Sequence, residues 1–178
     1  LTPIFEAEFG DEMYGYRPKR SAQGAVTAVL QAMKAGYTDV VDADLSKYFD
    51  TIPHEELLKS VSRRVSDGAV LHLVKLWLKA PIEEEDEAGR KRRTGGRDST
   101  MGTPQGGVIS PLLANIYMNR FLRAWRDRRM GEQLKAKVVN YADDFVILCR
   151  GTASAALDIT RRWMGSLSYA TSCVRGQR

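Results

Sequence analysis

Three aspartates lie in stretches of sequence that otherwise have the character of buried β-strands. Asp44 lies near the end of the run 40–45 (VVDADL), and Asp143 and Asp144 interrupt the largely apolar run 138–148. Carboxylates are rarely buried unless they are paired or hold a metal ion. Separate strands that each bring an aspartate to one edge can together hold divalent cations for phosphoryl transfer. The aspartates therefore favour a fold in which separate strands meet at a shared site.

The composition predicts one domain or a large piece of one. The chain has 178 residues, of which 43% are hydrophobic, and it contains no apolar run long enough to cross a membrane. The N-terminus has neither an initiator methionine nor the features of a signal peptide, which suggests a sequence that starts within a longer protein. Two unrelated cysteines fit a reducing compartment. A net charge of +5 mildly favours a polyanionic partner and leaves an ordinary basic protein equally open.

Hydrophobic periodicity and capping residues predict a mixture of helices and strands. Residues 82–100, in which an acidic run precedes a basic one, predict an exposed hairpin or loop. We expect helices over residues 21–35, over a segment opened by Pro53, and over residues 68–79 after the cap Asp67. Two further helices are expected, a long one capped by Ser110 and one over residues 153–165. Strands are expected over 38–45 and on both sides of 141–144.

The spacing of apolar residues also assigns faces to these elements. In strand 38–45, Val41, Ala43 and Leu45 fall on one face, and Asp42 and Asp44 fall on the other. The second face leaves two interpretations open, a cleft that holds metal ions or the solvated side of an edge strand. The residues expected in apolar helix stripes include Val26, Leu30 and Met33 in the first helix, and Trp77, Trp125 and Trp163 in later ones.

The segment 141–144 (YADD) predicts a tight hairpin with an unusual turn. Two-residue turns prefer Asn-Gly or Asp-Gly because they need positive φ, and this segment has no glycine. The adjacent carboxylates of Asp143 and Asp144 also repel each other unless a cation offsets their charge. A plain turn and a metal site both remain open from these residues alone.

Three further features admit both a functional and a structural interpretation. The glycines of segment 102–111 permit a close approach to a nucleotide, to which Gln105 offers a donor and an acceptor, or they form an ordinary turn before a helix. Arg17, Lys19 and Arg20 lie just before a helix and suit either phosphate contact or a solvated turn. Phe49 by itself indicates core packing, and His54 and His72 are interpreted as structural or surface residues.

Taken in order, four segments resemble conserved blocks of bacterial group II intron reverse transcriptases. They are the block GYRPKRS at 15–21, the block DADLSKYFDTIPH at 42–54, the block GTPQGGVISPLLAN at 102–115, and the block YADD at 141–144. The last block alone is a weak signal, whereas four blocks in this order are a strong one.

The resemblance implies an α+β fold, the palm of a right-hand polymerase with an antiparallel sheet backed by helices, together with part of the fingers. It implies that Asp44, Asp143 and Asp144, with the backbone carbonyl of Leu45, hold two Mg²⁺ ions, for which Mn²⁺ can substitute. Phe49 would exclude a 2′-hydroxyl, and the nucleotide pocket would include Gln105 and Gly106. The expected partners are an RNA template, a DNA primer, dNTPs and the intron RNA, in the bacterial cytoplasm and without a membrane.

The sequence also departs from this family at both ends. We expect a reverse transcriptase domain over 1–167 that lacks the first fingers strands, and an atypical tail over 168–178, as after a truncation or frameshift. Such a tail would leave out a palm strand and expose a sheet edge. Two alternatives remain open: an RNA-binding maturase remnant without polymerase activity, and a reverse transcriptase of retron or diversity-generating type.

Overall fold

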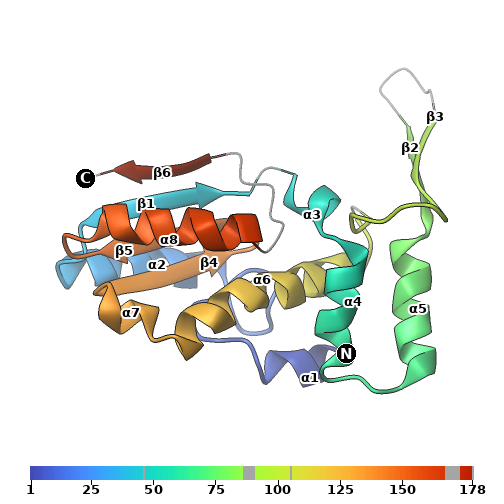
Figure 1. Cartoon of the computed structure of the whole chain (residues 1–178), viewed down its shortest axis with the longest axis horizontal. Coiled ribbons are helices and arrows are strands. Elements are labelled where there is room, and N and C mark those ends of the chain that lie inside the picture. The colour runs from blue at the N-terminus through green and yellow to red at the C-terminus, as the bar shows by residue number, and fades with distance from the viewer. Residues whose placement is uncertain (46, 86–90, 105, 167–172, 178) are drawn as a thin grey trace.

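A computed structural model describes residues 1–45, 47–85, 91–104, 106–166 and 173–177, and only the backbone of residues 44, 82–85, 91–94 and 173–177. The chain forms an antiparallel sheet with helices on both faces, and a second group of helices and a hairpin beside it (Figure 1). The helices are α1 (Thr2–Glu6), α2 (Ala22–Lys34), α3 (Tyr48–Thr51), α4 (His54–Ser62), α5 (Gly68–Leu78), α6 (Ser110–Asp127), α7 (Met130–Gln133) and α8 (Ala153–Ser166); the strands are β1 (Asp39–Asp44), β2 (Pro81–Glu85), β3 (Lys91–Gly95), β4 (Ala136–Tyr141), β5 (Asp144–Cys149) and β6 (Cys173–Gln177).

The main sheet has the strand order β4-β5-β1-β6, and every neighbouring pair is antiparallel. Alternate residues of β5 face different layers, as the two-residue period of a strand requires. Phe145 and Ile147 belong to the main core with α6 and α8, whereas Leu148 packs with Ala25 and Ala32 of α2. Helix α8 therefore covers one face of the sheet and α2 covers the other (Figure 1).

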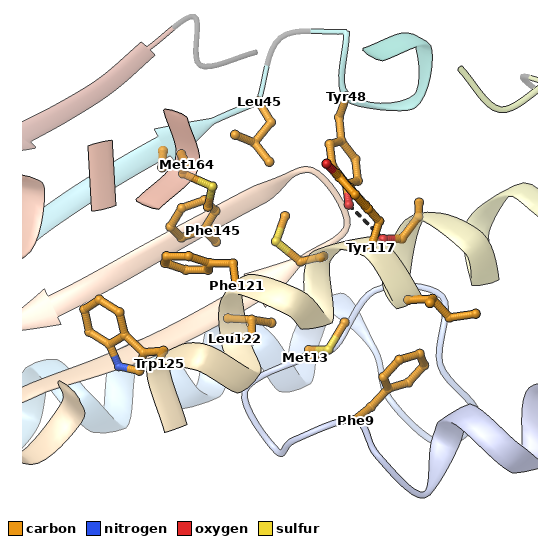
Figure 2. Close-up of a cluster of buried hydrophobic side chains, with 14 of the residues drawn as sticks. Phe9, Met13, Leu45, Tyr48, Tyr117, Phe121, Leu122, Trp125, Phe145 and Met164 are labelled. Atoms are coloured by element: carbon orange, nitrogen blue, oxygen red, sulfur yellow. Dashed lines mark hydrogen bonds between the residues drawn. The ribbon is translucent and has the colours of Figure 1, made fainter. Parts of the chain in front are cut away.

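An aromatic cluster joins the long helix α6 to the sheet and to α8. The ring of Phe121 lies 5.4 Å from that of Phe145, 5.8 Å from Trp125 and 6.2 Å from Trp163. Phe121 is fully buried, and Met164 of α8 closes the same cluster from above (Figure 2). Large apolar side chains of α6, β5 and α8 thus meet on one face of the sheet, and the strands of that sheet carry Asp44 and Asp144.

Two predictions about helix faces are wrong. Val26, Leu30 and Met33 of α2 are exposed, because α2 contacts the sheet through its small residues, Ala25 and Ala32. Trp77 is also exposed, since α5 buries only Val74 and Leu78. The predicted burial of Trp125 is confirmed, and Trp163 packs against the same core.

The starts of three helices follow the predictions, and a fourth differs. Ser21 caps α2 through its hydroxyl, Asp67 caps α5 through its carboxylate, and Pro53 precedes α4. Ser110 is instead the first residue of α6, after the N-cap Ile109. Its buried hydroxyl donates a hydrogen bond of 2.6 Å to the carbonyl of Pro104, so it holds the preceding loop rather than capping the helix.

The charged segment after α5 is a hairpin, which confirms one of the two expected forms. Strands β2 and β3 pair with Glu83 opposite Arg93, Glu84 opposite Arg92 and Glu85 opposite Lys91. The hairpin extends beyond α5, away from the main sheet (Figure 1).

The C-terminal segment differs from the expectation of an open sheet edge. Cys173–Gln177 form β6, which pairs along β1 from Val40 opposite Gln177 to Asp44 opposite Cys173. The expected tail over 168–178 therefore contributes a strand, while residues 168–172 and 178 lie outside the described residues. Within the described part of the chain, no helix is long and apolar enough to cross a membrane.

Candidate active site

The strand register brings two of the predicted aspartates to the same end of the sheet. Asp44, the last residue of β1, pairs with Asp144, the first residue of β5. Directly opposite Cα atoms in antiparallel strands lie about 4.5–5.5 Å apart. The two residues are far apart in the sequence, yet the pairing makes them immediate neighbours at the backbone.

Asp143 lies in the turn that precedes Asp144. Tyr141 pairs with Asp144, so Ala142 and Asp143 form the predicted two-residue hairpin turn between β4 and β5. Ala142 has a φ of 58°, which an alanine adopts at a cost of about 1–3 kcal/mol. Ala142 is buried, whereas Asp143 is partly exposed and Asp144 is exposed. The turn without glycine is therefore real, and it presents both carboxylates at the edge of the protein.

Two residues in neighbouring segments, one next to Gly15 and one three residues after Asp44, also have positive φ. Tyr16 has a φ of 55° and Lys47 has a φ of 52°, and neither is a glycine. Gly15, next to Tyr16, lies so close to the turn that a Cβ there would overlap the backbone nitrogen of Ala142. Left-handed residues other than glycine cluster at functional sites, where the surrounding structure holds them in place. Ala142 and Tyr16 are two such residues beside the aspartates, although Arg129 and Lys135 show that positive φ also occurs elsewhere in the chain.

Phe49 and Leu45 lie next to the aspartates along the chain. The Phe49 ring meets Tyr16 at 6.3 Å and Tyr48 at 5.8 Å between centroids, both edge to face, and Phe49 is only partly buried. Leu45 is buried, and its carbonyl accepts a hydrogen bond of 3.1 Å from the backbone N–H of Tyr48. A carbonyl oxygen has two lone pairs, so that of Leu45 can contact a second group besides Tyr48.

The glycine-rich loop before α6 is tied to the segment that contains Phe49. Thr103 donates its backbone N–H to the carbonyl of Phe49 at 2.7 Å, and Gly102 donates to Ile52 at 2.9 Å. His54 is buried and its Nε2 lies 2.6 Å from the carbonyl of Gly102, which confirms a structural role for this histidine. Gly106 is exposed with a φ of 78°, and Gln105 lies outside the described residues.

The basic cluster at 17–20 does not act as one unit. The Arg17 side chain is 5% exposed, pairs with Glu6 at 2.7 Å, and donates to the carbonyls of Gly10 and Met13. Arg17 therefore holds the N-terminal segment together and has no surface left for a phosphate. Arg20 pairs with Asp11, and Lys19 is exposed.

Cavities and clusters of ligating residues do not by themselves identify a site. One cavity of about 610 Å³ lies beside the loop before α6 and is lined by Trp77, Pro104 and Val108, among others. A second, of about 480 Å³, lies between α4 and α5. Among the side chains that the structure describes, which exclude that of Asp44, no three His, Cys, Asp or Glu residues group as a metal site. The candidate active site is therefore defined by the strand register and the turn.

Asn140, Asn115 and Gly15 contact or support the turn and were not predicted. The signal available in the sequence was a lone asparagine, Asn140, within an apolar strand. Gly15 lies in the block at 15–21 and Asn115 in the block at 102–115, but their hydrogen bond joins segments that are far apart in the chain.

Comparison with known proteins gives consistent matches. A family model described as "Reverse transcriptase (RNA-dependent DNA polymerase)" matches residues 1–172. "Protein YkfC" of Escherichia coli is 36% identical over 94% of this chain and 50% of its own length. "Group II intron-encoded protein LtrA" of Lactococcus lactis is 33% identical over 67% of this chain and 18% of its own length. The chain thus spans half, or less, of the curated relatives it matches.

Solved structures show the same fold at low sequence identity. A telomerase from Candida tropicalis superposes with a TM-score of 0.66 at 11% identity, over 94% of this chain and 36% of that chain. A telomerase from Candida albicans in complex with a fragment of telomeric RNA gives a TM-score of 0.67 at 10% identity, over 99% and 33%. These likenesses confirm the α+β polymerase fold that the sequence resemblance implied.

Proposed function

Because the chain belongs to the reverse transcriptase (RNA-dependent DNA polymerase) family, and the resemblance to group II intron enzymes is confirmed, we propose that it forms the polymerase core of such an enzyme. The reaction is attack of a primer 3′-hydroxyl on the α-phosphate of a dNTP, with release of pyrophosphate. One observation supports this most: Asp44 pairs with Asp144, with Asp143 on the adjoining turn.

The residues at this end of the sheet fit a pair of divalent cations. Mg²⁺ prefers oxygen ligands, typically one or two carboxylates completed by phosphates and water. Asp44, Asp143 and Asp144, with the carbonyl of Leu45, would hold two Mg²⁺ ions or Mn²⁺ in their place. When bound, such ions activate the attacking oxygen and neutralise the leaving one. The protein's share is to bring Asp44 and Asp144 together on two paired strands, with Asp143 on the adjoining turn.

Phe49 and the glycine-rich loop are the proposed nucleotide-binding elements. The Phe49 ring is fixed between two tyrosines, and its backbone is bonded to Thr103 at the start of the loop. A ring held in this way can reject a substrate with one additional hydroxyl by steric overlap. We place Gln105 and Gly106 in the same pocket, because loop backbone without a Cβ can approach a nucleotide closely.

Shortening Phe49 should weaken discrimination against ribonucleotides. For Phe49→Val, we expect the ratio of ATP to dATP incorporation to rise by about 10-fold or more, because even one missing methylene in a pocket changes discrimination by that amount and valine lacks the whole ring. The measurement is single-nucleotide primer extension with each substrate on the same preparation. An unchanged ratio, with dATP incorporation intact, would remove Phe49 from the pocket.

The proposed partners are an RNA template, a DNA primer and the intron RNA. The relative from Lactococcus lactis is named as group II intron-encoded, and a neighbouring telomerase was solved with RNA. Lys19, which is exposed, and Arg20 are the remaining candidates for phosphate contact. Because relatives from Escherichia coli and Lactococcus lactis are bacterial, the bacterial cytoplasm is the proposed compartment.

Primer extension on an RNA template tests this proposal against the maturase-remnant alternative. We expect dNTP addition that requires Mg²⁺ and stops with a chelator. RNA binding without any extension, and with the steep salt dependence of phosphate contacts, would favour the remnant. Extension that survives full removal of divalent cations would contradict the proposed site.

A further inference from the structure

Asn140 lies in β4 directly behind the aspartate turn and is fully buried. Its side-chain amide donates one hydrogen bond of 2.9 Å to the carbonyl of Ala142 and another of 3.1 Å to the carbonyl of Asp144. These two carbonyls lie on either side of Asp143. One amide group therefore ties together the backbone before and after this aspartate.

The backbone of Asn140 is itself held by a distant segment. Its N–H donates to the carbonyl of Glu12 at 2.7 Å, and its carbonyl accepts from the N–H of Tyr14 at 2.8 Å. The same segment continues to Gly15, whose carbonyl accepts a 2.8 Å hydrogen bond from the buried amide of Asn115 on α6. The turn is consequently enclosed by Asn140 from within the hairpin and by Gly15 from outside.

The amide of Asn140 is retained in an unfavourable environment. Its Oδ1 is buried and accepts no hydrogen bond from any described residue. Such an unsatisfied acceptor is costly, whereas an apolar residue of the same shape would avoid the cost. An asparagine at this place therefore needs an advantage, and its two donated bonds provide one. They hold a turn in which Ala142 has the left-handed conformation that an alanine disfavours.

We propose that Asn140 is a positioning residue of the active site, which sets the placement of Asp143 and Asp144 by fixing the carbonyls of the turn. It does not touch substrate or metal, and it acts through the backbone. This inference rests on the proposed function, because the positioning matters only if the aspartates hold cations. Interactions that orient metal ligands are typically worth 10–100-fold in metal affinity or activity.

The test is Mn²⁺ binding by the full chain, followed by electron paramagnetic resonance of the free ion. For Asn140→Leu we expect binding at least about 10-fold weaker than in the unmodified chain. Asn119→Leu is the matched control, because Asn119 is also a buried asparagine, bonded to Arg126 on α6 rather than to the turn. Its Mn²⁺ affinity should stay within about twofold, since the side chain of Asn119 makes no hydrogen bond to the carbonyls of the turn. Amide hydrogen exchange should also accelerate in residues 140–145 of Asn140→Leu alone.

The outcomes separate this inference from the function on which it rests. Wild-type affinity and exchange in a folded Asn140→Leu chain, with loss of Mn²⁺ in Asp143→Asn, would overturn the inference and leave the metal site standing. Absence of Mn²⁺ binding in the unmodified chain would overturn both. If Asn140→Leu does not fold, Asn140→Ser, which keeps a shorter donor, decides the question by the same two measurements.

Discussion

Asp44→Asn should lower the rate of nucleotide addition by at least about 10³-fold, because metal ions contribute several kcal/mol to stabilising the charge of a transition state. The substitution preserves size and removes the charge that attracts a cation. Asp44 is directly opposite Asp144 in the sheet, so the substitution removes the carboxylate that β1 contributes to the proposed metal ligands. Presteady-state primer extension measures the rate. The affinity for the RNA template, measured by filter binding, should remain unchanged.

Asp42 provides the matched control for Asp44. It lies in the same strand and is exposed, but its register partner on β5 is Val146, two residues inward from the turn. We expect Asp42→Asn to change nucleotide addition by no more than about twofold, as for other surface substitutions. Equal losses in both variants would show that the general acidity of β1, rather than its end, is what matters.

Phe121→Ala should have the largest effect on folding, a loss of about 3–5 kcal/mol in the free energy of unfolding. The side chain is fully buried beside Trp125 and Phe145 (Figure 2), and its ring also contacts that of Trp163 on α8. Removing it leaves a cavity between α6, β5 and α8. Urea denaturation, followed by circular dichroism, gives the free energy directly.

Val108→Ala is the control for this measurement, because Val108 is fully exposed in the loop before α6. Its unfolding free energy should stay within about 0.5 kcal/mol of the unmodified chain. A loss below about 1 kcal/mol for Phe121→Ala would mean that α6 does not pack against the sheet as described.

The period of a strand made the faces of β1 predictable, whereas the outward face of α2 was not. Val41, Ala43 and Leu45 are buried as expected, because a strand has only two faces and the apolar one must be covered. A helix with apolar residues on several sides can dock by its largest or by its smallest residues. In α2 the alanines Ala25 and Ala32 face the sheet, and the larger residues Val26, Leu30 and Met33 do not.

The candidate site was predictable in its residues but not in its support. The aspartates were noticeable because they interrupt apolar strands, and the hairpin segment 141–144 because it lacks glycine. Arg17 was considered as a phosphate contact, because the sequence gives no sign of its ion pair with Glu6, a residue outside the basic cluster. The bonds from Asn140 were equally hidden, because an asparagine near a turn usually has only a local role.

The most direct test of this account is RNA-templated primer extension by the chain beside its Asp143→Asn variant, with RNA affinity measured on the same preparations. The account predicts extension by the unmodified chain, a loss of at least about 10³-fold in the variant, and equal RNA affinity for the two. Extension by Asp143→Asn at the unmodified rate would contradict the assignment of the aspartate turn as the centre of catalysis.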